Sequence, residues 1–92
     1  MNYLLNHTTE LSIELDNKRV RLVIYQGSEE RVCRKENISR IKEFLVQQEG
    51  RLFKGRLQLH KIDQQINIEV KGKVIGNLDV DHFTAMLQNA TV

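Results

Sequence analysis

Residue types that perform catalysis or bind metal are sparse in this 92-residue chain, and their spacing matches no known pattern. The three histidines, His7, His60 and His82, and the single cysteine, Cys33, are far apart in the sequence. Metal sites in proteins usually place such ligands a few residues from one another. The five glycines form no phosphate-binding loop motif. We therefore expect no catalytic residue, no metal site and no cofactor, and we predict that the protein is not an enzyme.

Two short segments come closest to a metal site or a reactive cysteine, and each has a simpler interpretation. Asp79, Asp81 and His82 lie within four residues of one another, but aspartates at the start of a helix cap it and interact favourably with its dipole. Cys33 precedes Arg34, and a neighbouring cation lowers the pKa of a thiol. A lone cysteine in a strand is nevertheless usually a small packing residue.

Lysine and arginine remain as the candidate binding residues. The net charge is only +2, but the side chains expected on the solvent-facing side of the strands include eight Lys or Arg and three Asp or Glu. A basic sheet face that also carries a tyrosine suits a phosphate backbone and a stacked, unpaired base. We predict a nucleic-acid-binding face, preferably for single strands, formed by Arg19, Arg21, Tyr25, Lys54, Arg56, Lys71 and Lys73.

The alternative is a protein–protein interaction or oligomerisation module with no role in nucleic-acid binding. Exposed strands carry Lys and Arg for a second reason, because charge prevents edge-to-edge pairing of sheets. The positions of Arg19, Arg21 and Arg56 separate the two hypotheses. One continuous patch favours nucleic acid, and separate surfaces favour the interaction module.

The strands that position these residues are predicted from alternating apolar and polar side chains. Residues 11–15 and 20–24 alternate in this way, and so do residues 57–59 and 66–70 at a constant offset of 46. Residues 31–35 and 74–78 are predicted to add a third strand to each half. Turn-forming residues at positions 16–18, 63–64 and 71–73 separate neighbouring strands.

Each half then ends in an amphipathic helix. Apolar residues follow helical spacing after Asn37 and after Asp79, and both residues are good N-caps. Gly50 is the predicted C-cap of the first helix. The predicted core, taken from the central apolar positions of both halves, is Ile24, Ile41, Leu45, Ile68, Phe83 and Leu87.

These elements predict an α+β fold in one domain, residues 1–92. Its antiparallel sheet or sheets are formed by a possible internal repeat, βββα-βββα, with units 10–50 and 51–92, and its two helices pack on one sheet face. The alternative to duplication is that any two hairpin-plus-helix units share this level of likeness.

A curved antiparallel sheet backed by helices and built from two repeats is similar in outline to the Whirly and PUR families. Those families bind single-stranded nucleic acid, which is what the resemblance implies for this chain. Their units have four strands before the helix, whereas three are predicted here, and no family motif is present. The resemblance therefore concerns element order alone.

Other features concern location and assembly. No signal peptide and no membrane-spanning stretch is recognisable, and the single cysteine is typical of a reducing compartment. We expect a cytoplasmic protein without a membrane partner. Free sheet edges favour a homo-oligomer, and a twofold dimer is the commonest assembly.

Overall fold

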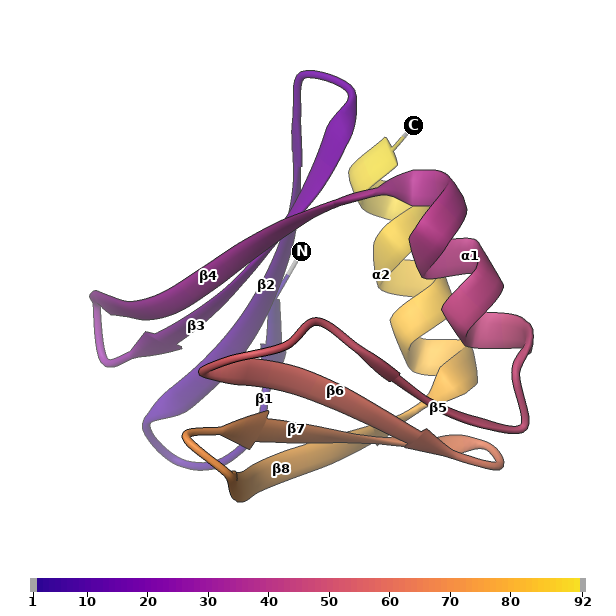
Figure 1. The fold of residues 1–92 in the computed structure, drawn as a ribbon. Helices are drawn as coiled ribbons and strands as arrows, with labels where there is room; N and C mark the ends of the chain where they lie inside the picture. Colours follow the sequence, from indigo (N-terminus) through magenta and orange to yellow (C-terminus); the bar gives the residue numbers. More distant parts are fainter. Residues whose placement is uncertain (1, 92) are drawn as a thin grey trace.

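The computed structural model describes residues 2–91, which form two four-stranded antiparallel sheets and two helices (Figure 1). The N-terminal sheet has the order β1 (Asn2–Leu4), β2 (Thr9–Asp16), β3 (Arg19–Gln26) and β4 (Glu29–Asn37). The C-terminal sheet has the order β5 (Glu49–Leu52), β6 (Leu57–Ile62), β7 (Gln65–Val70) and β8 (Lys73–Asp79). Each sheet is followed by its helix, α1 (Ile38–Val46) or α2 (Val80–Thr91), and the predicted α+β class is confirmed.

Each half has four strands before its helix, so the prediction of three was wrong. The additional strands are β1, of three residues, and β5, of four, and both lie at sheet edges. Strands of this length contain too few residues for an alternation of apolar and polar side chains to be recognised in the sequence. The element order is therefore ββββα in both halves, the strand number of the Whirly and PUR units, and it is consistent with an internal repeat.

The observed capping residues agree with the prediction at the start of α2 and differ from it at α1. The backbone N–H of His82 donates to Asp79 Oδ1 at 2.7 Å, so Asp79 caps α2 as predicted. Asn37 occupies the N-cap position of α1 but makes no side-chain cap bond. Gly50 is not the C-cap of α1, because the helix ends at Val46 and Gly50 belongs to β5. Because α1 ends at Val46, the residues after it are able to form the additional strand β5.

One apolar cluster joins both sheets and both helices. Five of the six predicted core residues are buried, and Leu45 is the exception because it is only partly buried. Its neighbour Phe44 is buried instead, since the side of α1 that faces the sheets contains Ile41 and Phe44. The core combines residues from the two halves, among them Leu11, Ile13, Leu22, Leu59, Ile66, Phe83 and Met86.

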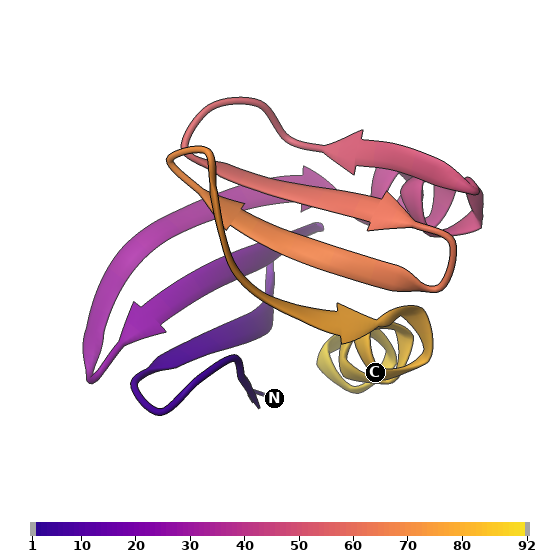
Figure 2. The same ribbon diagram turned by 90° about the horizontal axis from the view of Figure 1, so that it is seen from below.

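The two halves are interlocked rather than placed side by side. α2 contacts β2 of the N-terminal sheet as well as β8, and α1 contacts both β4 and β5 (Figures 1 and 2). The N-terminal segment in turn contacts residues of the C-terminal half. Leu5 lies against Gly76, where an added Cβ would meet Leu5 Cβ at 2.9 Å, and the Tyr3 ring meets the His82 ring edge-on at 4.6 Å. In residues 2–91 no helix is long and apolar enough to cross a membrane.

Three of the hairpin turns contain residues with left-handed backbone. Asn17, Asp63 and Lys71 have φ values of 57°, 54° and 53°, and Asn and Asp tolerate this region better than most residues. The predicted turns at residues 16–18, 63–64 and 71–73 are therefore confirmed. Lys71 consequently lies at the tip of the β7–β8 hairpin and not on a strand.

Candidate functional site

On the outer face of the N-terminal sheet, Arg21 is neutralised by two carboxylates. One of its terminal nitrogens donates to Glu14 Oε1 at 2.9 Å on β2, and the other donates to Glu30 Oε1 on β4. These bonds, that to Glu30 above all, raise the pKa of Arg21 above its usual value. Tyr25 also bonds to Arg21. Arg21 therefore connects three strands and has little charge left for a phosphate.

One of the cations near Arg19 is also paired with a carboxylate. Lys35 Nζ lies 2.7 Å from Asp16 Oδ2, and this contact lowers the pKa of Asp16. Both residues line a hollow of about 450 Å³ at the β2–β3 hairpin, together with Asn17, Lys18 and Arg19. The lining of this hollow therefore contains three cations and one carboxylate, and Lys35 is the cation that is paired with it.

The centre of this face is also less accessible than alternation predicted. Val23 has an exposed fraction of 0%, although it points to the outer side with its cross-strand neighbour Ser12, which is likewise buried. The bridge formed by Glu14, Arg21 and Glu30 spans the same face. The alternation of β3 places Val23 on the solvent-facing side together with Arg21, so its burial differs from what the alternation predicts.

The remaining predicted site residues lie at strand ends of the C-terminal sheet. Lys54 and Arg56 belong to the β5–β6 loop, Lys71 to the β7–β8 turn, and Lys73 begins β8. Arg56 lies beside Gln26, at the opposite end of β3 from Arg19. The predicted single patch containing Arg19, Arg21 and Arg56 is therefore not formed, and by the criterion stated above this result counts against that nucleic-acid face and in favour of the interaction module.

A different group of cations gathers where the edge strand β4 meets the β5–β6 loop and the β7–β8 turn, at the end of the molecule away from the helices (Figure 2). A hollow of about 490 Å³ is lined by Arg31 from β4, Arg56 from the loop and Lys71 from the turn, and its other lining residues are Gln26, Val32 and Val70. Within residues 2–91, Arg56 and Lys71 have no carboxylate within ion-pair distance.

A second, separate hollow of about 270 Å³ lies farther along β4, toward α1, and shares no lining residue with the first. Its wall contains an arginine and an aromatic ring in contact, because the Arg34 guanidinium carbon lies 5.4 Å from the centre of the Phe53 ring. This distance is typical of a cation–π interaction. The lining residues are Arg34, Glu36, Arg40, Arg51, Leu52, Phe53 and Lys54.

We call the two hollows together the cationic groove. Its charged residues are Arg31, Arg34, Glu36, Arg40, Arg51, Lys54, Arg56 and Lys71. It contains seven of the fourteen Lys and Arg but one of the twelve Asp and Glu. The groove thus has a formal charge of +6, and the other seven basic and eleven acidic residues give the rest of the protein −4. The charge is concentrated here and not spread over a sheet face.

Phe53 holds its position in the groove with a backbone conformation that a bulky side chain rarely adopts. Its φ is 71°, which is in the left-handed region. Such strain is more frequent at functional sites than elsewhere, where the surrounding structure holds it in place. The conformation lets the ring lie beside Arg34 while also packing against the core.

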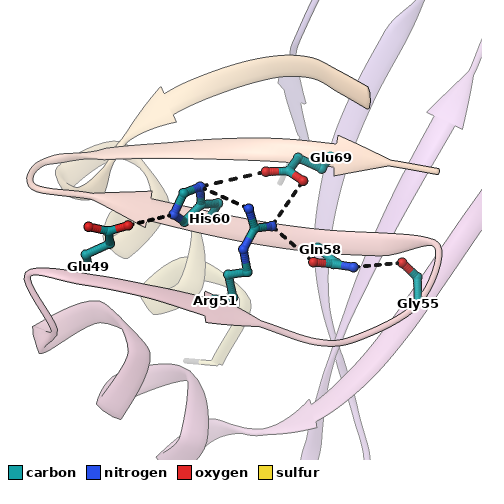
Figure 3. A network of polar contacts seen from close by, with 6 residues as sticks. All are labelled: Glu49, Arg51, Gly55, Gln58, His60 and Glu69. Carbon is teal, nitrogen blue, oxygen red and sulfur yellow. Dashed lines mark hydrogen bonds and ion pairs between the residues drawn. The ribbon is translucent and has the colours of Figure 1, made fainter. Parts of the chain in front are cut away.

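Arg51 connects the groove to a polar network on the outer face of the C-terminal sheet (Figure 3). Arg51 donates to Glu69 Oε1 at 3.0 Å and to Gln58 Oε1 at 3.1 Å. His60 lies between Glu49, 3.2 Å from its Nε2, and Glu69, 3.8 Å from its Nδ1. These contacts orient Arg51 and pair its charge, so it forms the border of the groove.

The sequence-based site residues included Lys54, Arg56 and Lys71 of the groove but omitted Arg34, Arg40 and Phe53. One signal for the groove was present in residues 51–56, "RLFKGR", where three cations flank an aromatic residue and a glycine. Among residues 2–91 no group of three or more His, Cys, Asp or Glu side chains has the arrangement of a metal site. The Lys and Arg side chains of the groove are suited to binding an anion.

Comparison with known proteins yields no match to a protein family, to a curated protein or to a solved structure.

Proposed function

We propose that this protein binds single-stranded nucleic acid through the cationic groove. The observation that carries the proposal is the concentration of Lys and Arg in the lining of the groove, seven in all. Three of them, Arg31, Arg40 and Arg51, are paired with Glu29, Glu36 and Glu69. Four of these cations, Arg34, Lys54, Arg56 and Lys71, have no ion-pair partner in the described chain. Free cations gain most from a phosphate, because binding releases the counterions of the strand.

The preference for a single strand follows from the contact between Arg34 and Phe53. Unpaired bases stack on aromatic rings and on guanidinium planes, and every base offers a π-face for such contacts. Within the groove this pair lies beside Lys54, which is placed to hold a neighbouring phosphate. The ββββα order of each half adds support by analogy with Whirly and PUR units.

Removing two free cations should reduce the salt dependence of binding. Four phosphate contacts to a single strand predict a slope of log affinity against log salt of roughly −3, since each contributes about −0.7. The double variant Lys54→Ala/Arg56→Ala should therefore have a slope of roughly −1.4. Fluorescence anisotropy with a labelled oligonucleotide at several salt concentrations measures it.

The matched control is Lys18→Ala/Arg19→Ala, which removes the same charge from the exposed β2–β3 hairpin. This control should keep the slope of the original protein. An equal reduction in both double variants would show that net charge alone governs binding, and a reduction in the control alone would restore the face first predicted around Arg19. Absence of oligonucleotide binding at low salt would rule out the proposed function.

Replacing Arg34 by lysine tests the stacking contact separately from the charge. Arg34→Lys keeps the cation but loses the planar group. We expect single-strand affinity to fall by about 1–3 kcal/mol, as for loss of one stacked base, while the salt slope stays unchanged. Duplex affinity should change less. Equal losses for single-stranded and duplex oligonucleotides would contradict stacking at this position.

The interaction module remains the second candidate, because Arg19 and Arg56 lie at opposite ends of β3. Its favourable feature is the edge strand β8, whose Val74 side chain is 52% exposed. Pairing of two β8 edges would form a homodimer. Sedimentation at high micromolar concentration distinguishes the two candidates, since a salt-insensitive dimer without oligonucleotide binding supports the module.

A further inference from the structure

A second, smaller hollow opens between the two sheets, next to the cationic groove. Its volume is about 140 Å³, and its lining includes Ile24 from β3, Val70 from β7 and Ile75 from β8. Thr9, Gln26 and Arg31 complete the wall. We call it the inter-sheet hollow. It shares Gln26, Arg31 and Val70 with the part of the groove that contains Arg56 and Lys71, so the two spaces are continuous.

The two spaces differ in chemistry. Ile24, Val70 and Ile75 give the inter-sheet hollow an aliphatic wall. The adjoining part of the groove is lined by three cations, of which Arg56 and Lys71 are unpaired within residues 2–91 and Arg31 lies 3.6 Å from Glu29 in an exposed ion pair. A ligand that fits both has a small apolar body joined to a multiply charged anion. An apolar cavity of about 150 Å³ accommodates one benzene-sized ring, so the body is one ring system and not a long chain.

We propose that the inter-sheet hollow holds the nucleobase of a nucleotide whose phosphate lies on Arg31, Arg56 and Lys71. The aliphatic wall would pack on the faces of the base. The Thr9 hydroxyl and the Gln26 amide supply hydrogen-bonding groups for its polar edge. A phosphate matches three cations better than a single carboxylate does, because it carries up to two charges and more acceptor oxygens. The inference rests on the proposed function, since both use the same cations.

The nucleotide has two sources, a free mononucleotide or the last nucleotide of a bound strand. Methyl NMR of the whole chain tests both with three probes, uridine 5′-monophosphate, whose base is a single six-membered ring, ribose 5-phosphate and a ten-residue oligonucleotide with or without a terminal abasic site. The mononucleotide should shift the methyl signals of Ile24, Val70 and Ile75, and ribose 5-phosphate should not. Equal shifts with the two small probes would overturn the proposal.

Oligonucleotide affinity then identifies the source. A roughly tenfold loss on introducing the abasic site assigns the hollow to a strand end, and mononucleotide binding at least as tight as that of the oligonucleotide assigns it to the free nucleotide. Oligonucleotide binding without base-dependent methyl shifts leaves the proposed function in place and removes this inference. Methyl shifts with the mononucleotide in a protein that binds no oligonucleotide would remove the proposed function and leave this inference in place.

A variant that fills the hollow provides the second test. Val70→Phe should abolish the methyl shifts of Ile24 and Ile75 and lower affinity roughly tenfold, with the salt slope unchanged. Val74→Phe adds the same ring at an exposed position of the adjacent strand, and it should behave like the original protein. If Val70→Phe fails to fold, Thr9→Val keeps the volume, removes one hydroxyl contact and should weaken mononucleotide binding roughly fivefold. Unchanged mononucleotide binding in a folded Val70→Phe variant would contradict the proposal.

Discussion

Phe83→Ala should lower the free energy of unfolding by about 3–5 kcal/mol, the usual cost of truncating a buried phenylalanine. Phe83 has an exposed fraction of 0% and is among the largest fully buried side chains. It lies on α2, the helix that contacts both β2 and β8. The variant therefore leaves a cavity in the cluster shared by the two halves. Urea denaturation followed by circular dichroism measures the change.

The loss would be a large fraction of the total stability. A domain of this size is stable by about 5–14 kcal/mol at the typical value per residue. The control is Val46→Ala on α1, because Val46 is a large apolar helix residue with an exposed fraction of 84%. It should change stability by no more than about 0.5 kcal/mol. A loss below about 1 kcal/mol for Phe83→Ala would contradict the packing described for α2.

Lys61→Ala should also be strongly destabilising, because this lysine is part of the core. Its exposed fraction is 3%, and its Nζ donates to the backbone carbonyl of Gln47, the C-cap of α1. The C-terminus of a helix has a partial negative charge and unpaired carbonyls, which a buried ammonium satisfies. Alanine removes the packed stem and the donor together, at a cost of about 2–5 kcal/mol.

Lys61→Met separates these two contributions. Methionine keeps an unbranched apolar stem of similar length and removes the charge and the donor. It should destabilise less than alanine, since packing is retained and an ammonium no longer has to be desolvated. Urea denaturation of both variants, with Lys42→Ala on the exposed side of α1 as control, measures the difference. Equal stability of Lys61→Ala and the original protein would show that the contact with Gln47 has no structural role.

The sequence predicted the class of fold because its longest elements follow simple periods. β2, β3, β6 and β7 alternate clearly, and Asp79 marks the start of α2 through a short cap bond. The burial of Lys61 was not predicted, although it follows Leu57 and Leu59 on the same parity and therefore points inward. A charged side chain on that parity becomes acceptable only when a helix terminus is placed beside it, which the sequence alone does not indicate.

The candidate site was harder to predict than the fold. Alternation assigns Arg34 to the same side of β4 as Val32, the side that faces the core. Arg34 is nevertheless exposed, because β4 is an edge strand and Arg34 lies beside the β5–β6 loop, where it contacts Phe53. The neighbourhood of Arg31, Arg56 and Lys71 depends in turn on how the two halves cross. The alternation of side chains along a strand tells which side each residue faces, but it carries no information about how the two halves cross.

The position of α2 on β2 also determines when the protein can fold during its synthesis. The N-terminal sheet and α1 leave the ribosome first, yet part of the apolar face of that sheet is covered by residues 80–91 at the end of the described chain. Chains emerge at about 5–20 residues per second, so this face stays open until residues 80–91 have also left the ribosome. Folding of the first half is therefore expected to wait for α2, and until then its exposed apolar face is a natural client for a chaperone.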